Sequence, residues 1–83
     1  MEENLYLKST ILEVVNNQLQ ADDPPIVRQT FDRLIAEGYS EIEAKKLIGC
    51  VLAIEIFEIL KKQEPYNDDR YTKALNRLPE LPK

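Results

Sequence analysis

The feature that most constrains this chain is a long apolar run near its middle. Between Leu47 and Leu60 only Glu55 and Glu58 carry a charge. At about 100° per residue, the apolar side chains of a helix over this run cover nearly its whole circumference, and such a helix is expected to be buried. The chain has only 83 residues. We therefore expect one wall of this helix to be covered by a second molecule.

The residues before this run predict a tight helical hairpin. Gly38 suits the left-handed position that follows a helix, and Ser40-Glu41-Ile42-Glu43 matches the capping box that begins the next one. The helix before Gly38 is expected to be amphipathic. Its predicted core stripe is Val27, Phe31, Leu34 and Ile35, and the side chains expected to face away are Gln29, Arg33 and Ala36.

Proline-containing segments delimit two further helices. Asp22-Asp23-Pro24-Pro25 ends the first helix, and Pro25 suits the first turn of the second. Glu64-Pro65-Tyr66-Asn67 ends the third helix, and Asn67 or Asp68 can cap a fourth. The first helix has a broad apolar stripe of Leu5, Ile11, Leu12, Val15 and Leu19, and the fourth has a face of Tyr71, Ala74, Leu75 and Leu78.

These signals predict a single all-α domain over residues 1–83. Its three main helices are expected over about residues 3–20, 25–37 and 41–62, with a shorter C-terminal helix over about 68–78. No segment alternates like a strand, and no repeat is visible. Short connections favour antiparallel neighbours, with the third helix at the centre.

Composition excludes several classes of function. The chain has no histidine, one cysteine and two glycines. A Cys/His zinc site, a disulfide framework, histidine catalysis and a glycine-rich phosphate loop each need residues that are absent, so we expect no cofactor. With 15 acidic and 11 basic residues, the chain has a net charge of −4, which argues against nucleic acid as a partner.

The sequence also predicts a cytoplasmic protein that does not bind membranes. Its first residues lack the basic and apolar segments of a secretory signal. The longest uncharged, mainly apolar run is Leu47 to Ile54, well short of the ~20 residues that span a bilayer. Cys50 lies beside Ile48, Val51 and Leu52, and we expect it to be a small buried hydrophobic residue.

Glu55 is the most unusual residue, because it falls in the middle of the expected inward face of the third helix. An ionised carboxylate there needs a partner or a raised pKa. In one interpretation Glu55 and Glu58 are acid/base or metal carboxylates that act with Asn17 or Gln18. In the other, Glu55 lies at a seam between chains or pairs with Lys8, Arg28 or Arg70. Di-metal bundles use histidines that this chain lacks, so we assign no catalytic or metal-binding residue.

The leading functional hypothesis is a non-enzymatic helical interaction module. It would self-associate, as a homodimer, or bind another protein through the uncovered wall of the third helix, formed by Gly49, Ala53, Ile56 and Leu60. One alternative is a carboxylate-centred enzyme or a domain that binds a divalent metal through Glu55 and Glu58. The other alternative is a small regulatory subunit of a larger complex.

The order of these signals resembles a family of small, uncharacterised bacterial all-helical domains. The resemblance covers about residues 12–78 and consists mostly of caps, turns and core positions, so it implies a helical fold and no assigned activity. Some members carry histidines on the third helix, where this chain has Ile42 and Lys46. The matching segments are Asn17-Gln18-Leu19, Pro24-Pro25-Ile26-Val27, Thr30, Arg33-Leu34, Gly38, Glu43-Ala44, Ile48-Gly49, Pro65-Tyr66, Tyr71 and Leu75.

Overall fold

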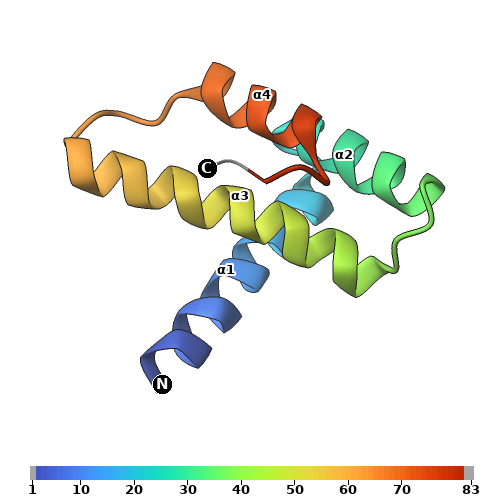
Figure 1. Ribbon diagram of the computed structural model, residues 1–83, viewed down its shortest axis with the longest axis horizontal. Coiled ribbons are helices and arrows are strands. Elements are labelled where there is room, and N and C mark those ends of the chain that lie inside the picture. Colours follow the sequence, from blue (N-terminus) through green and yellow to red (C-terminus); the bar gives the residue numbers. More distant parts are fainter. Residues whose placement is uncertain (1, 82–83) are drawn as a thin grey trace.

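The computed structural model describes residues 2–81, and it describes side chains from residue 9 onward. It contains four helices: α1 (Glu2–Ala21), α2 (Pro25–Ala36), α3 (Glu41–Lys62) and α4 (Asp68–Arg77) (Figure 1). No strand occurs within the described range, so the predicted all-α fold is confirmed. Each predicted helix end lies at or next to the observed one. The predicted roles of the Leu5 and Lys8 side chains fall outside the described side chains.

The hairpin between α2 and α3 forms as the sequence predicts. Gly38 has a φ of +104°, and its N–H donates to the carbonyl of Ile35 at 3.0 Å. The next N–H, of Tyr39, donates to the carbonyl of Leu34 at 3.1 Å, which completes a Schellman motif. The Ser40 hydroxyl then accepts from the Glu43 N–H at 3.1 Å, and the Glu43 carboxylate accepts from the Ser40 N–H at 2.9 Å. This reciprocal pair is the capping box of α3.

The other two connections use different local devices. Asp22 adopts a left-handed conformation with a φ of 56°, and the N–H of Asp23 donates to the carbonyl of Gln18 at 3.1 Å. This turn closes α1, and Pro25 then begins α2. At the other end of the molecule, the Asn67 side chain accepts from the Arg70 N–H at 3.0 Å and caps α4.

Helix α3 is the central element and contacts each of the other three helices. Helices α2 and α4 run antiparallel to it, whereas α1 crosses it at a steep angle (Figure 1). The first turns of α1 extend beyond the rest of the molecule (Figure 1). No described helix combines the length and the apolar character that crossing a membrane requires. The fully buried side chains come from all four helices and include Val15, Val27, Leu34, Ile48, Tyr71 and Leu75.

Gly49 marks the point where α1 crosses α3. A Cβ atom at this position would lie 3.2 Å from Cγ2 of Ile11, with Leu12 and Val15 next nearest. The expectation that Gly49 belongs to an uncovered wall is therefore wrong, since α1 covers it. The expectation that Cys50 is buried is also wrong, because the next position along α3 points about 100° away from the crossing and is exposed.

Arg33 has a structural role that the sequence pattern does not indicate. We expected it to face away from the core, but its guanidinium donates to the carbonyls of Leu78 at 2.8 Å and Leu75 at 3.0 Å. It also pairs with Glu37 at 3.1 Å. Carbonyls at the C-terminal end of a helix lack partners within the helix, so Arg33 satisfies the end of α4 and links α2 to it.

Candidate functional site

The C-terminal half of α3 carries a group of exposed apolar side chains. We define the apolar patch as Ile54, Ile56, Phe57 and Leu60. Phe57 is 59% exposed and Leu60 is 72% exposed, although both lie on the central helix of the domain. No described helix covers this part of α3, so a single copy of the chain leaves one wall of the helix exposed, while coverage of that wall by a second molecule stays a prediction.

The four predicted partner-binding residues differ in exposure, depending on how close they lie to the point where α1 crosses α3. Gly49 is buried and Ala53 packs against the core, so neither contributes much surface. Ile56, at 37% exposed, and Leu60 remain accessible. Phe57 lies between them in sequence and is a member that the wall predicted from spacing did not include. The accessible wall is therefore shorter than predicted and is confined to the C-terminal turns of α3.

Glu55 is buried, and its carboxylate is held by Arg70 of α4. Nε of Arg70 donates to both carboxylate oxygens, at 3.0 and 2.9 Å, and its Nη2 donates to Oε1 at 2.8 Å. Hydrogen bonds to the carboxylate raise the pKa of Arg70 above its ordinary value. The sequence had left three cationic partners open, and the structure selects Arg70. The pair joins the C-terminal half of α3 to α4.

The other residues of the carboxylate hypothesis do not converge on Glu55. Glu58 pairs with Lys62 at 3.0 Å, and this ammonium lowers the pKa of the carboxylate. Asn17 is exposed. The Gln18 side chain accepts from the Tyr71 hydroxyl at 3.2 Å. Among the side chains of residues 9–81, no group of three or more Asp, Glu, Cys or His is placed to hold a metal ion. The geometry therefore favours a structural role for Glu55.

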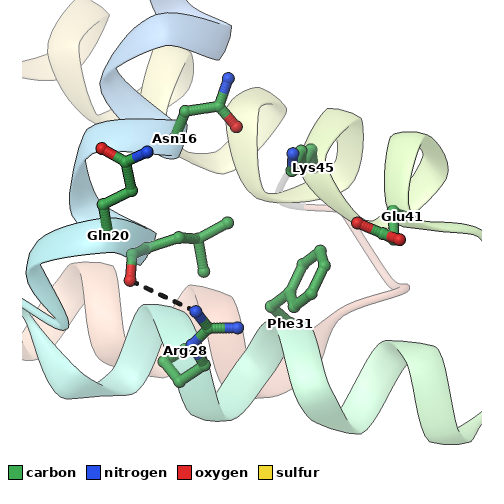
Figure 2. Close-up of a pocket in the computed structure, with 7 residues that line it drawn as sticks. Asn16, Gln20, Arg28, Phe31, Glu41 and Lys45 are labelled. Atoms are coloured by element: carbon green, nitrogen blue, oxygen red, sulfur yellow. Dashed lines mark hydrogen bonds between the residues drawn. The ribbon is translucent and has the colours of Figure 1, made fainter.

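A second feature lies at the opposite end of α3, where the end of α1, the first turns of α2 and the start of α3 meet. It is a pocket of about 400 Å³, which we call the junction pocket (Figure 2). Sequence reasoning missed it because its walls come from three helices. The only local signal was the run of amides at the end of α1. Its lining residues are Asn16, Leu19, Gln20, Arg28, Phe31, Glu41 and Lys45.

Tyr71 of α4 packs in the core, and its hydroxyl donates to the side chain of Gln18 on α1. It is fully buried, and burial raises the pKa of its phenol. Tyr66 packs edge-on against it, with ring centroids 6.1 Å apart, and has a pKa raised to about 12. Both phenols are therefore neutral at physiological pH. Their arrangement supports packing between α4 and the rest of the domain rather than acid/base chemistry.

Comparison with known proteins identifies no relative. No family model, no curated protein and no solved structure matches the chain. The resemblance to small bacterial helical domains therefore stays a prediction. The surface of the chain itself therefore has to indicate the function, and the apolar patch and the junction pocket are the features that bear on it.

Proposed function

We propose that this chain is a non-enzymatic helical interaction module that self-associates through the apolar patch of α3. The observation that carries the proposal is the exposure of Phe57 and Leu60 on the central helix. Contiguous apolar surface of this kind is characteristic of protein contacts. The excess of 15 acidic over 11 basic residues favours a protein partner over nucleic acid.

The size of the patch indicates how much additional surface an interface needs. Four large side chains with exposed fractions of 37–72% leave about 400 Å² of apolar surface in water. A stable interface buries roughly 800 Å² on each partner. The patch therefore supplies about half of one side of an interface, and the remainder has to come from a neighbouring element.

The first turns of α1 are the element best placed to supply it. They extend beyond the body of the domain and diverge from the C-terminal half of α3 (Figure 1). In a two-fold dimer, the first turns of α1 in each copy would lie on the apolar patch of the other copy. The same contact would therefore form twice, once from each copy. The charges are complementary, because α1 begins with Glu2 and Glu3 whereas α3 ends with Lys61 and Lys62.

Sedimentation equilibrium of the intact chain, up to high micromolar concentration, tests the proposal. We expect the wild-type chain to form dimers and Phe57→Asp to be monomeric, because a charge at the patch centre would be desolvated on association. Ile42→Asp is the matched control. Ile42 is also an exposed apolar residue of α3, at 65%, but it lies on the other side of the α1 crossing.

Two results would overturn self-association. One is a wild-type chain that stays monomeric throughout the concentration range, which would leave a different protein as the occupant of the patch. The other is an Ile42→Asp chain that dissociates as readily as Phe57→Asp. Circular dichroism of each variant verifies that the helices are intact before the comparison is made.

A further inference from the structure

The junction pocket lies far from the apolar patch and has a different chemistry. Glu41 and Lys45 line it from the first turns of α3, whereas the patch occupies the last turns. Its volume of about 400 Å³ falls within the range of sites that bind small molecules. A ligand of the junction pocket would therefore bind independently of self-association through the apolar patch.

Two cationic side chains line the pocket from different helices. Arg28 comes from α2 and Lys45 from α3, and Figure 2 shows them on opposite walls with Phe31 between them. The guanidinium of Arg28 has only long contacts, at 3.5 Å to the carbonyl of Leu19 and 3.7 Å to Asp32. Lys45 makes no hydrogen bond or ion pair with any residue that the structure describes. Both side chains thus retain donors for an anion.

The floor of the pocket is apolar and holds Arg28 in place. Leu19 and Phe31 are 7% and 8% exposed, so their side chains form a nearly buried base. The guanidinium carbon of Arg28 lies 5.7 Å from the centroid of the Phe31 ring, within reach of a cation–π contact. A flat apolar group that enters the pocket would contact the exposed edge of the Leu19 and Phe31 side chains, next to Arg28 and Lys45.

The remaining polar residues define the charge that the pocket accepts. Asn16 and Gln20, one turn apart on α1, also line the pocket, and Figure 2 shows the Asn16 amide on the side of α1 toward α3 and the Gln20 amide farther from α3. Glu41 is the single carboxylate of the lining. Two cations and one carboxylate line the pocket, and Asp32, outside the lining, lies 3.7 Å from Arg28, so the pocket carries at most a small positive surplus in a chain whose net charge is −4. This surplus matches a monoanion better than a dianion.

We infer that the junction pocket binds a small monocarboxylate with a flat apolar body. The carboxylate lies between Arg28 and Lys45, and the apolar body rests against Phe31. Asn16 and Gln20 donate to its remaining oxygen lone pairs. A phosphate monoester offers similar acceptors but carries more negative charge, which brings it into repulsion with Glu41.

NMR titration of the intact ¹⁵N-labelled chain, at constant ionic strength, tests this inference with four probes. Benzoate supplies both the carboxylate and the ring, acetate lacks the ring, benzamide lacks the charge, and phenyl phosphate carries more charge. We expect saturable shifts of the side-chain amide signals of Asn16 and Gln20 with benzoate. Weaker binding is expected with phenyl phosphate and with acetate, and no saturable shift with benzamide.

The chain offers a closely matched pair of lysines for the mutational test. We expect Lys45→Met to weaken benzoate binding about tenfold, the value of one charged hydrogen bond. Lys46→Met removes the same charge from the adjacent position, which is exposed and does not line the pocket, and should change the affinity by less than about twofold. Arg28→Met removes the other cation of the pocket, on α2, and should also weaken benzoate binding.

Three outcomes would overturn the inference. The first is equal shifts with benzoate and benzamide, since the charge would then play no part. The second is an equal loss of affinity in Lys45→Met and Lys46→Met, which would indicate general electrostatic attraction. The third is tighter binding of phenyl phosphate than of benzoate, which would assign the pocket to phosphate monoesters. The backbone spectrum of each variant establishes that the fold is retained.

Discussion

Both halves of α3 contribute buried residues to the core, but they differ in how many large apolar side chains they expose, with Ile42 alone in the first half and four residues in the second. The N-terminal half, residues 41–50, begins at a capping box and packs under α1 and α2, with Ala44 and Ile48 fully buried. The C-terminal half, residues 51–62, is joined to α4 by the pair of Glu55 and Arg70 and leaves the apolar patch in water. Residue type alone therefore did not determine burial along this helix. The point at which α1 crosses α3, near Gly49, determines how far along α3 the surface is covered by α1.

The largest expected effect is a difference in stability between the same isoleucine-to-alanine substitution made in each half of α3. Ile48 is fully buried in the N-terminal half, and Ile48→Ala should lower the free energy of unfolding by about 2–5 kcal/mol through lost transfer energy and a new cavity. Ile56 is 37% exposed, and Ile56→Ala should cost less than about 1 kcal/mol. Urea unfolding at dilute protein concentration measures both. Equal losses would contradict the contrast between the halves.

The next effect concerns the ion pair that ties the C-terminal half to α4. Arg70→Met leaves the buried Glu55 carboxylate without its partner, and we expect the melting temperature to fall by several degrees. The double variant Glu55→Met/Arg70→Met removes both charges and should recover most of that loss. Thermal unfolding followed by circular dichroism gives all three values. A double variant less stable than Arg70→Met would show that the pair stabilises the fold by more than avoiding an unpaired charge.

Alkaline pH should act on the C-terminal side of the molecule through Tyr71. Its folded-state pKa is raised by burial above the ordinary value of 10.0, so the unfolded chain loses the phenolic proton first. Stability from this group is complete below pH 10 and declines as the pH rises further. Tyr71→Phe should cost about 1 kcal/mol at neutral pH through the lost bond to Gln18, and should flatten the alkaline decline.

Urea unfolding at a series of pH values measures the slope of the alkaline decline. Tyr66→Phe is the comparison: the pKa of Tyr66 is also raised, to about 12, but its side chain is 51% exposed and packs at the edge of the same ring, so this variant should flatten the decline less than Tyr71→Phe does. An unchanged alkaline slope in Tyr71→Phe would mean that another group controls the decline. A larger change in Tyr66→Phe than in Tyr71→Phe would assign it to the exposed phenol.

Acid should act on the N-terminal half through its capping box, with the smallest effect of the four. The backbone N–H and the hydroxyl of Ser40 lower the pKa of Glu43 below its ordinary value of 4.5. A carboxylate with a lowered folded-state pKa contributes stability above its unfolded pKa and loses it as the pH falls through the folded value. Glu43→Gln should therefore show a weaker loss of stability below about pH 4.5 than the wild-type chain. Carbon-detected NMR titration of Glu43 verifies the direction of the pKa shift.

The helix ends could be predicted because their signals act over a few residues. Gly38 and Ser40 mark the hairpin, Pro25 begins α2, and Asn67 caps α4, as each does in the structure. The candidate sites were less accessible to sequence reasoning. The inward position of Glu55 was predicted, but the sequence left open whether it pairs with one of three cations or lies at a seam between chains, and the structure shows Arg70 as its partner. The junction pocket could not be anticipated, since its seven lining residues become neighbours only when three helices meet.

The sequence by itself determined the class of the fold, the number and ends of the helices, and the presence of an apolar α3 too long for a small domain to cover. These properties follow from backbone preferences, capping and periodicity, which depend on residues close together in the chain. Only the tertiary structure decided that Gly49 lies under α1, that Cys50 is exposed, that Arg33 caps α4 and that Arg70 holds Glu55. Those outcomes depend on the angles at which helices cross, and these are set by packing among side chains distant in sequence.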